Sequence, residues 1–256
     1  RTTVGISVPS GSREVCLREQ IDYDDRQPSQ PWEEARLHNA RLFAGFADRL
    51  IAAMRPWEVE PLVASLWPGI VRDMHAGGSL VTALAAGRNR LERTWGIRNL
   101  ELPVSRLSQL PQFLSFVADL LTRIPEVQRD YNEVVGRYRQ VNRVRNAQHP
   151  VPDLRREGHR YEAPFWVWKA GESRRGRLFV ETTPGAIVLT DGTRQVATWN
   201  SSGSGNPADL ALELSLLEGR GWKLRPRALT LTLFARVFLG DLFVHGIGGA
   251  KYDEMT

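Results

Sequence analysis

The hydrophobic pattern of the chain changes its period at residues 149–152, a His-Pro-Val-Pro link, and this change limits the fold more than any other feature. Before the link, apolar residues recur every three or four positions, as in helices; after it they alternate, as in strands. The sequence therefore predicts an α/β protein in three parts. These are a mostly helical part with short N-terminal strands over 1–148, an antiparallel β meander over 149–206, and a helix–strand–turn–helix segment over 207–256.

The helical part contains clear helix boundaries. Pro56 interrupts the first helical pattern, and Pro68 predicts a kink in the next. Gly77 and Gly78 end that second helix, and Ser79 is a suitable N-cap for the third. Five helices are expected here, over 42–51, 59–76, 79–95, 105–122 and 125–145. Two short extended pieces, over 4–8 and 14–18, precede them.

The second half of the chain predicts short strands separated by turns rich in glycine. Past the meander, Asn206 and Pro207 open a helix over 208–218. Arg225 and Pro226 are expected to open another helix, and the apolar residues 242–245 a short buried strand. The expected meander strands are 165–169, 177–181, 186–190 and 194–199.

Composition excludes several classes of protein. Hydrophobic residues make up 42% and charged residues 25% of the 256 residues, which is ordinary for a globular chain. The net charge is +5, but the basic residues are almost all arginine and are spread among acids, so nucleic acid is an unlikely partner. A single cysteine, Cys16, excludes an internal disulfide, and no metal-ligand spacing is present. The longest apolar run, 229–244, carries Arg236 and Asp241, so no membrane span is expected. We expect a cytoplasmic location.

The glycine-rich turn over 245–252 is the most specific candidate for a working site. A strand that passes through glycines into a helix presents free amide groups and a positive helix end, which bind phosphate or carboxylate. Lys251 would add a positive charge, and His245 is a candidate donor or base. The predicted anion-binding glycines are Gly246, Gly248 and Gly249. The alternative is a tight structural turn, because the spacing matches neither the Walker motif nor G-x-G-x-x-G.

Two arginines, Arg225 and Arg227, flank Pro226. Arginine does not stabilise the positive end of a helix dipole, so at an expected helix start these side chains are candidates for contacts with an anionic substrate. The alternative interpretation is a pair of surface arginines in a chain rich in arginine.

The order of these features resembles that of bacillithiol synthases, the cysteine-adding enzymes of bacillithiol assembly. The matching pieces are His149-Pro150, residues 165–180, residues 224–227 and residues 247–249. The chain also looks like uncharacterised bacterial proteins that share its H-G-I-G-G-x-K-Y-D segment. This resemblance implies a helix-rich Rossmann-like core, ligation of an amino acid to a small sugar-derived anionic acceptor, and a site for a nucleotide. It carries over to Arg225 or Arg227, and to Gly248 and Gly249.

Two further expectations concern the chain as a whole. It begins at Arg1 and ends in what reads as the first turn of a helix, which favours a fragment of a longer protein. The alternative to an enzyme that binds a small anionic ligand is a non-catalytic binding or assembly module that forms homo-oligomers. In that case the tryptophans of the meander and the helix bearing Tyr131 and Tyr138 would contact the partner.

Overall fold

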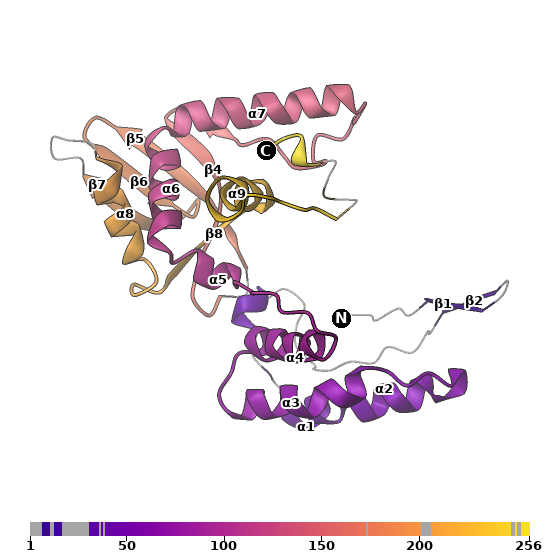
Figure 1. Ribbon diagram of the computed structural model, residues 1–256. Helices are drawn as coiled ribbons and strands as arrows, with labels where there is room; N and C mark the ends of the chain where they lie inside the picture. Colours follow the sequence, from indigo (N-terminus) through magenta and orange to yellow (C-terminus); the bar gives the residue numbers. More distant parts are fainter. Residues whose placement is uncertain are drawn as a thin grey trace. The chain divides into compact units, whose positions relative to one another are not determined.

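The computed structural model describes the backbone of residues 7–10 and 13–16, together with residues 31–35, 37, 39–172, 174–200, 206–246, 249 and 252–256. The chain forms two units, Arg1–Glu101 and Leu102–Thr256 (Figure 1). The expected boundaries at 148/149 and 206/207 differ from this division. The meander and the C-terminal segment belong to one unit, because a strand from the segment pairs with the meander.

The described residues of the N-terminal unit form helices and one pair of antiparallel strands. Ser79 caps its last helix as predicted, since its hydroxyl accepts a hydrogen bond from the amide of Thr82. Pro68 lies inside a helix, and Pro56 lies in a 3-10 turn that separates two helices. The elements are β1 (Ser7–Ser10), β2 (Arg13–Cys16), η1 (Trp32–Glu34), α1 (Ala40–Ala44), α2 (Phe46–Met54), η2 (Arg55–Trp57), α3 (Val63–His75) and α4 (Leu80–Thr94).

The core of the N-terminal unit forms around Trp67 of α3. Its indole lies 4.6 Å from the rings of both Phe43 and Phe46, and its N–H donates to the carbonyl of Phe43 at 2.6 Å. Helices α3 and α4 approach closely where Gly87 faces Ile70: a Cβ at Gly87 would lie 2.5 Å from Ile70 Cγ1. Close packing of these two helices therefore depends on the absence of a side chain at Gly87.

The C-terminal unit is built on an antiparallel sheet, which confirms the predicted meander. Its order is β3-β4-β5-β6-β7, and β8 pairs with the C-terminal half of β4. All strand pairs of the described residues are antiparallel. The strands are β3 (Arg156–Glu157), β4 (Arg160–Lys169), β5 (Gly176–Thr183), β6 (Ala186–Thr190), β7 (Gln195–Asn200) and β8 (Trp222–Pro226).

Helices cover this sheet, and α6 and α8 lie side by side on one face of it (Figure 1). The side chains of Phe113, Phe165 and Phe234 join α6, β4 and α9 in one buried cluster. The helices are α5 (Val104–Leu107), α6 (Pro111–Thr122), α7 (Ile124–Val141), α8 (Pro207–Ser215) and α9 (Ala228–Phe234), which continues as a π-helix over Ala235–Leu239.

Three predicted elements of the C-terminal unit are wrong. The helix expected over 105–122 is two helices, because Pro111 starts a new one. Arg225 and Pro226 do not open a helix: they end strand β8, where Arg225 pairs with Trp166, and α9 begins at Ala228. Residues 242–245 form no strand, and Leu242 and Val244 are 82% and 80% exposed.

Within the described ranges, no helix is both long and apolar enough to cross a lipid bilayer. The described residues form a mixed architecture of helices and an antiparallel sheet.

The close approach of α3 and α4 gives the first prediction. Gly87→Ala should lower the free energy of unfolding of the N-terminal unit by about 1–3 kcal/mol, because the buried Ile70 must move. Gly136→Ala in α7 is the matched control. A Cβ there meets no atom within 4 Å, so it should stabilise its unit by about 0.5–1 kcal/mol. Urea unfolding followed by circular dichroism measures both, and equal effects of the two variants would contradict the packing described.

Candidate functional site

Of the predicted strand–turn–helix, the strand over 242–245 is absent, whereas the described residues Gly249, Tyr252 and Asp253 are helical. Gly246 and Gly249 are described, whereas Gly248 and Lys251 lie outside the described residues. The amide of Gly249 donates to the carbonyl of Gly246 at 2.8 Å, so this N–H is not free to hold an anion. A Cβ on Gly249 would lie 2.8 Å from Nδ1 of His245, so glycine is required here for the histidine ring to pack.

The candidate base His245 lies in a cluster around Asp253. Arg236 donates to Asp253 Oδ1 at 2.7 Å and Thr256 donates to the same oxygen at 2.8 Å. Nε2 of His245 lies 3.3 Å from the same oxygen without forming a hydrogen bond. The hydrogen bond from Thr256 lowers the pKa of Asp253 against the effect of burial, and the charge of Arg236 lowers it further. Among the described residues, His245 and Asp253 are therefore engaged in contacts within the protein.

Two pieces of the sequence resemblance meet in space. The ring of Tyr252 lies 6.0 Å from that of His149 and 6.1 Å from that of Tyr138 in α7. The hydroxyl of Tyr252 lies 3.5 Å from Nε2 of His149. The C-terminal motif and the His-Pro link are therefore neighbours at the end of α7.

Arg225 and Arg227 are both buried, so the alternative of two surface arginines is wrong. Arg225 contacts Glu218 at 2.7 Å, donates to the carbonyl of Leu224 at 2.8 Å and lies over the ring of Trp168. Arg227 directly follows β8, and its amide donates to the carbonyl of Pro164 at 3.1 Å. The side chain of Arg227 extends to Glu162 of β4.

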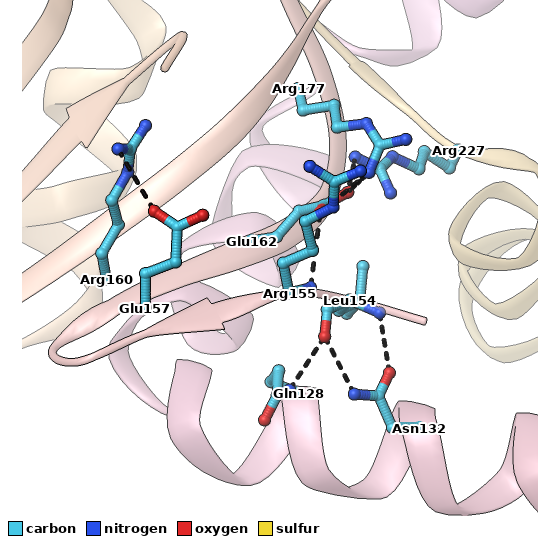
Figure 2. A network of polar contacts seen from close by, with 9 residues as sticks. All are labelled: Gln128, Asn132, Leu154, Arg155, Glu157, Arg160, Glu162, Arg177 and Arg227. Atoms are coloured by element: carbon cyan, nitrogen blue, oxygen red, sulfur yellow. Dashed lines mark hydrogen bonds and ion pairs between the residues drawn. The ribbon is translucent and has the colours of Figure 1, made fainter. Parts of the chain in front are cut away.

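Glu162 was not predicted as a site residue, although its carboxylate is the centre of a network of arginines (Figure 2). The Glu162 side chain is fully buried. Nη1 of Arg177 lies 3.0 Å from both carboxylate oxygens, and Nη2 of Arg227 lies 2.7 Å from Oε1. Arg155 Nε lies 4.0 Å from Oε2, and the Arg155 amide donates to Oε2 at 3.3 Å. We refer to Glu162, Arg155, Arg177 and Arg227 as the arginine cluster.

Neighbouring segments hold the arginine cluster in place. Gln128 and Asn132 of α7 both donate to the carbonyl of Leu154 at 2.9 Å, and the amide of Leu154 donates back to Asn132 at 2.8 Å (Figure 2). These bonds fix the backbone next to Arg155. The guanidinium of Arg227 also lies 4.7 Å from the ring centre of Trp166, which makes a cation–π contact.

The charges of the arginine cluster do not balance. Three guanidinium groups lie against one carboxylate, so the four side chains carry an excess of two positive charges. Arg177 and Arg155 are 30% and 63% exposed, so this excess reaches solvent. Within the described ranges, Arg177 and Arg155 make no other ion pair or side-chain hydrogen bond. A small anion with two or more oxygens is the group that such donors recognise.

A pocket of about 290 Å³ lies between α7 and α9, with Pro164 of β4 in its wall. We refer to it as the α7–α9 pocket. Tyr131 lines it, and burial raises the pKa of that hydroxyl to about 12, although the nearby charge of Arg227 opposes this and that of Glu162 adds to it. The hydroxyl of Tyr131 is therefore close enough to Arg227 and Glu162 for their charges to act on it. Its other lining residues are Leu120, Arg123, Val127, Asp130, Val134, Val135, Leu229, Thr230, Leu233, Met255 and Thr256.

In the part of the chain that the structure describes, no three histidine, cysteine, aspartate or glutamate side chains gather as metal ligands would. No model of a known protein family, no curated protein and no solved structure matches the chain. The function is therefore argued from the geometry of the C-terminal unit.

The burial of Glu162 gives the second prediction. Glu162→Gln should lower the free energy of unfolding by about 2–4 kcal/mol, since it leaves Arg227 buried without a countercharge. Glu181→Gln is the control on the adjacent strand. Glu181 is 44% exposed and its one ion pair within the described ranges is with Arg160 at 3.8 Å, so its loss should cost less than about 1 kcal/mol. Denaturant unfolding of both variants checks this, and an unchanged midpoint for Glu162→Gln would show that the carboxylate does not hold the cluster.

Proposed function

We propose that the C-terminal unit binds a small anionic ligand at the arginine cluster. The observation that carries the proposal is the convergence of three arginines on one buried carboxylate. Glu162 lies against these guanidinium groups as their countercharge, and the excess positive charge is left toward solvent. Charge-assisted hydrogen bonds from a guanidinium to a carboxylate or phosphate are among the strongest that proteins form.

The arginine cluster is also held in a defined geometry. Arg177 projects from the sheet, Arg155 follows a backbone segment bonded to α7, and Arg227 is stacked on Trp166. Donors that are already oriented lose less conformational entropy on binding, which favours affinity. The site thus has the features expected of a recognition site for a carboxylate or phosphate.

A more specific version of the proposal is a ligase resembling bacillithiol synthases, with a nucleotide as a further ligand and a cytoplasmic location. Its support is the motif resemblance, which includes Arg225 or Arg227. A Rossmann-like core, which has a parallel sheet, is part of this version alone. Every strand pair of the described ranges is antiparallel. Gly248 and Lys251 also remain predictions of this version, since they lie outside the described residues.

A second candidate function is a non-catalytic binding or assembly module. The stretch that follows α9 supports it, because several large apolar side chains there are exposed, among them Val237, Phe238 and Leu242. Exposed apolar patches on a soluble protein often mark contacts with another chain. This candidate predicts self-association that depends on protein concentration.

The third prediction tests the anion site. Inorganic phosphate and L-malate, each titrated into the protein, should raise its melting temperature if either binds the folded state. Arg177→Gln should weaken the binding constant about tenfold or more, because it removes a charge-assisted donor. Arg220→Gln is the matched control: Arg220 is a partly exposed arginine of the same unit that pairs with Glu213, and its loss should leave binding unchanged.

Two other variants locate the site. Lys251→Ala and Gly248→Ala should not alter binding at the arginine cluster; selective loss of binding in those two would place the anion at the glycine turn instead. Thermal stability that does not respond to either anion, together with dimerisation in analytical ultracentrifugation, would favour the assembly module.

A further inference from the structure

The α7–α9 pocket is a second feature of the C-terminal unit with room for a ligand. Its volume of about 290 Å³ is close to the lower end of the range for small-molecule sites, on the order of 300–1,000 Å³. It would hold roughly ten water molecules, at about 30 Å³ each. The size therefore fits a molecule such as a substituted benzene, and not a nucleotide.

Most of the pocket wall is apolar. Helices α6 and α7 contribute Leu120, Val127 and Val134, and α9 contributes Leu229 and Leu233. Water in such a cavity finds few hydrogen-bond partners, so an apolar ligand body would displace it at low cost.

The charged residues of the wall have partners of their own. Arg123 pairs with Asp119, and Asp130 pairs with Arg129 at 2.9 Å. An ionised ligand would therefore find no uncompensated charge on the lining residues, and it would lose its hydration against apolar side chains. The wall favours an uncharged ligand.

The polar groups of the wall include one free hydrogen-bond donor. The hydroxyl of Thr230 donates to the carbonyl of Pro164 at 3.1 Å, and that of Thr256 donates to Asp253. The hydroxyl of Tyr131 has no hydrogen-bond partner among the described residues that line the pocket or surround it. Because burial raises the pKa of Tyr131 to about 12, this hydroxyl keeps its proton at neutral pH.

We propose that the α7–α9 pocket binds an uncharged small molecule with an aromatic or branched aliphatic body and one carbonyl acceptor that receives a hydrogen bond from Tyr131. This site goes beyond the proposed anion site and does not depend on it. The arginine cluster recognises charge, whereas the pocket recognises apolar shape and a single acceptor.

Two isosteric probes, acetophenone and α-methylstyrene, test the proposal on the whole chain. They have the same shape, but the second carries a methylene group in place of the carbonyl oxygen. Ligand-observed NMR titration should show saturable binding of both at millimolar concentration. Acetophenone should bind about three- to tenfold more tightly, which corresponds to one hydrogen bond.

Three variants assign this binding to the pocket. Tyr131→Phe should remove the preference for acetophenone while both probes still bind. Leu233→Trp should fill the pocket and abolish binding of both probes, whereas Leu212→Trp, an exposed position on α8, should bind as the original chain does. Circular dichroism confirms that each variant is folded.

The proposal is overturned if neither probe binds in a saturable way, if Tyr131→Phe keeps the preference for acetophenone, or if folded Leu233→Trp binds both probes unchanged.

Discussion

The C-terminal unit depends on one buried carboxylate, that of Glu162. Transfer of this charge out of water is costly, and it is offset here by guanidinium groups from three other segments: the residue before β3, strand β5, and the junction of β8 and α9. The carboxylate of β4 therefore connects four segments of the C-terminal unit through its contacts with these arginines. Three positive charges surround one negative charge. The contacts that stabilise the buried carboxylate therefore also leave positive charge at the surface. The proposed recognition role of the arginine cluster would therefore have the same physical origin as its structural role.

How far the fold could be predicted from the sequence depended on the range of the interactions. The helices over 40–94 and the strands of the meander follow local periodicity, and their existence was predicted correctly. Strand β8 was missed because it forms by pairing with β4, which lies far away in sequence. Residues 242–245 have the composition of a buried strand, but they pair with no described strand, and Leu242, Phe243 and Val244 are exposed. Composition alone does not supply the partner strand that such a segment requires.

The candidate site shows the same limit. Arg227 was selected because it was expected at a helix start, and it is the N-cap residue of α9, with its side chain against Glu162. Glu162 could have been found from a different pattern, since it is a lone acid within the otherwise apolar run Tyr161–Phe165. The contacts of Asp253 with His245 and Arg236 could not have been derived from spacing, because their meeting requires the tertiary fold. Tyr131 was considered as part of a helix face, and only the packing of α9 shows that it lines a cavity.

A double-mutant cycle between Glu162 and Arg227, measured as free energies of unfolding, tests the central role of the buried carboxylate most directly. The single variants Glu162→Gln and Arg227→Gln and the double variant isolate the coupling between the two side chains. A buried pair with its nitrogen and oxygen 2.7 Å apart should give a coupling energy of about 1.5 kcal/mol or more. A coupling energy near zero would show that Glu162 does not organise the arginines, and would remove the basis of the proposed anion site.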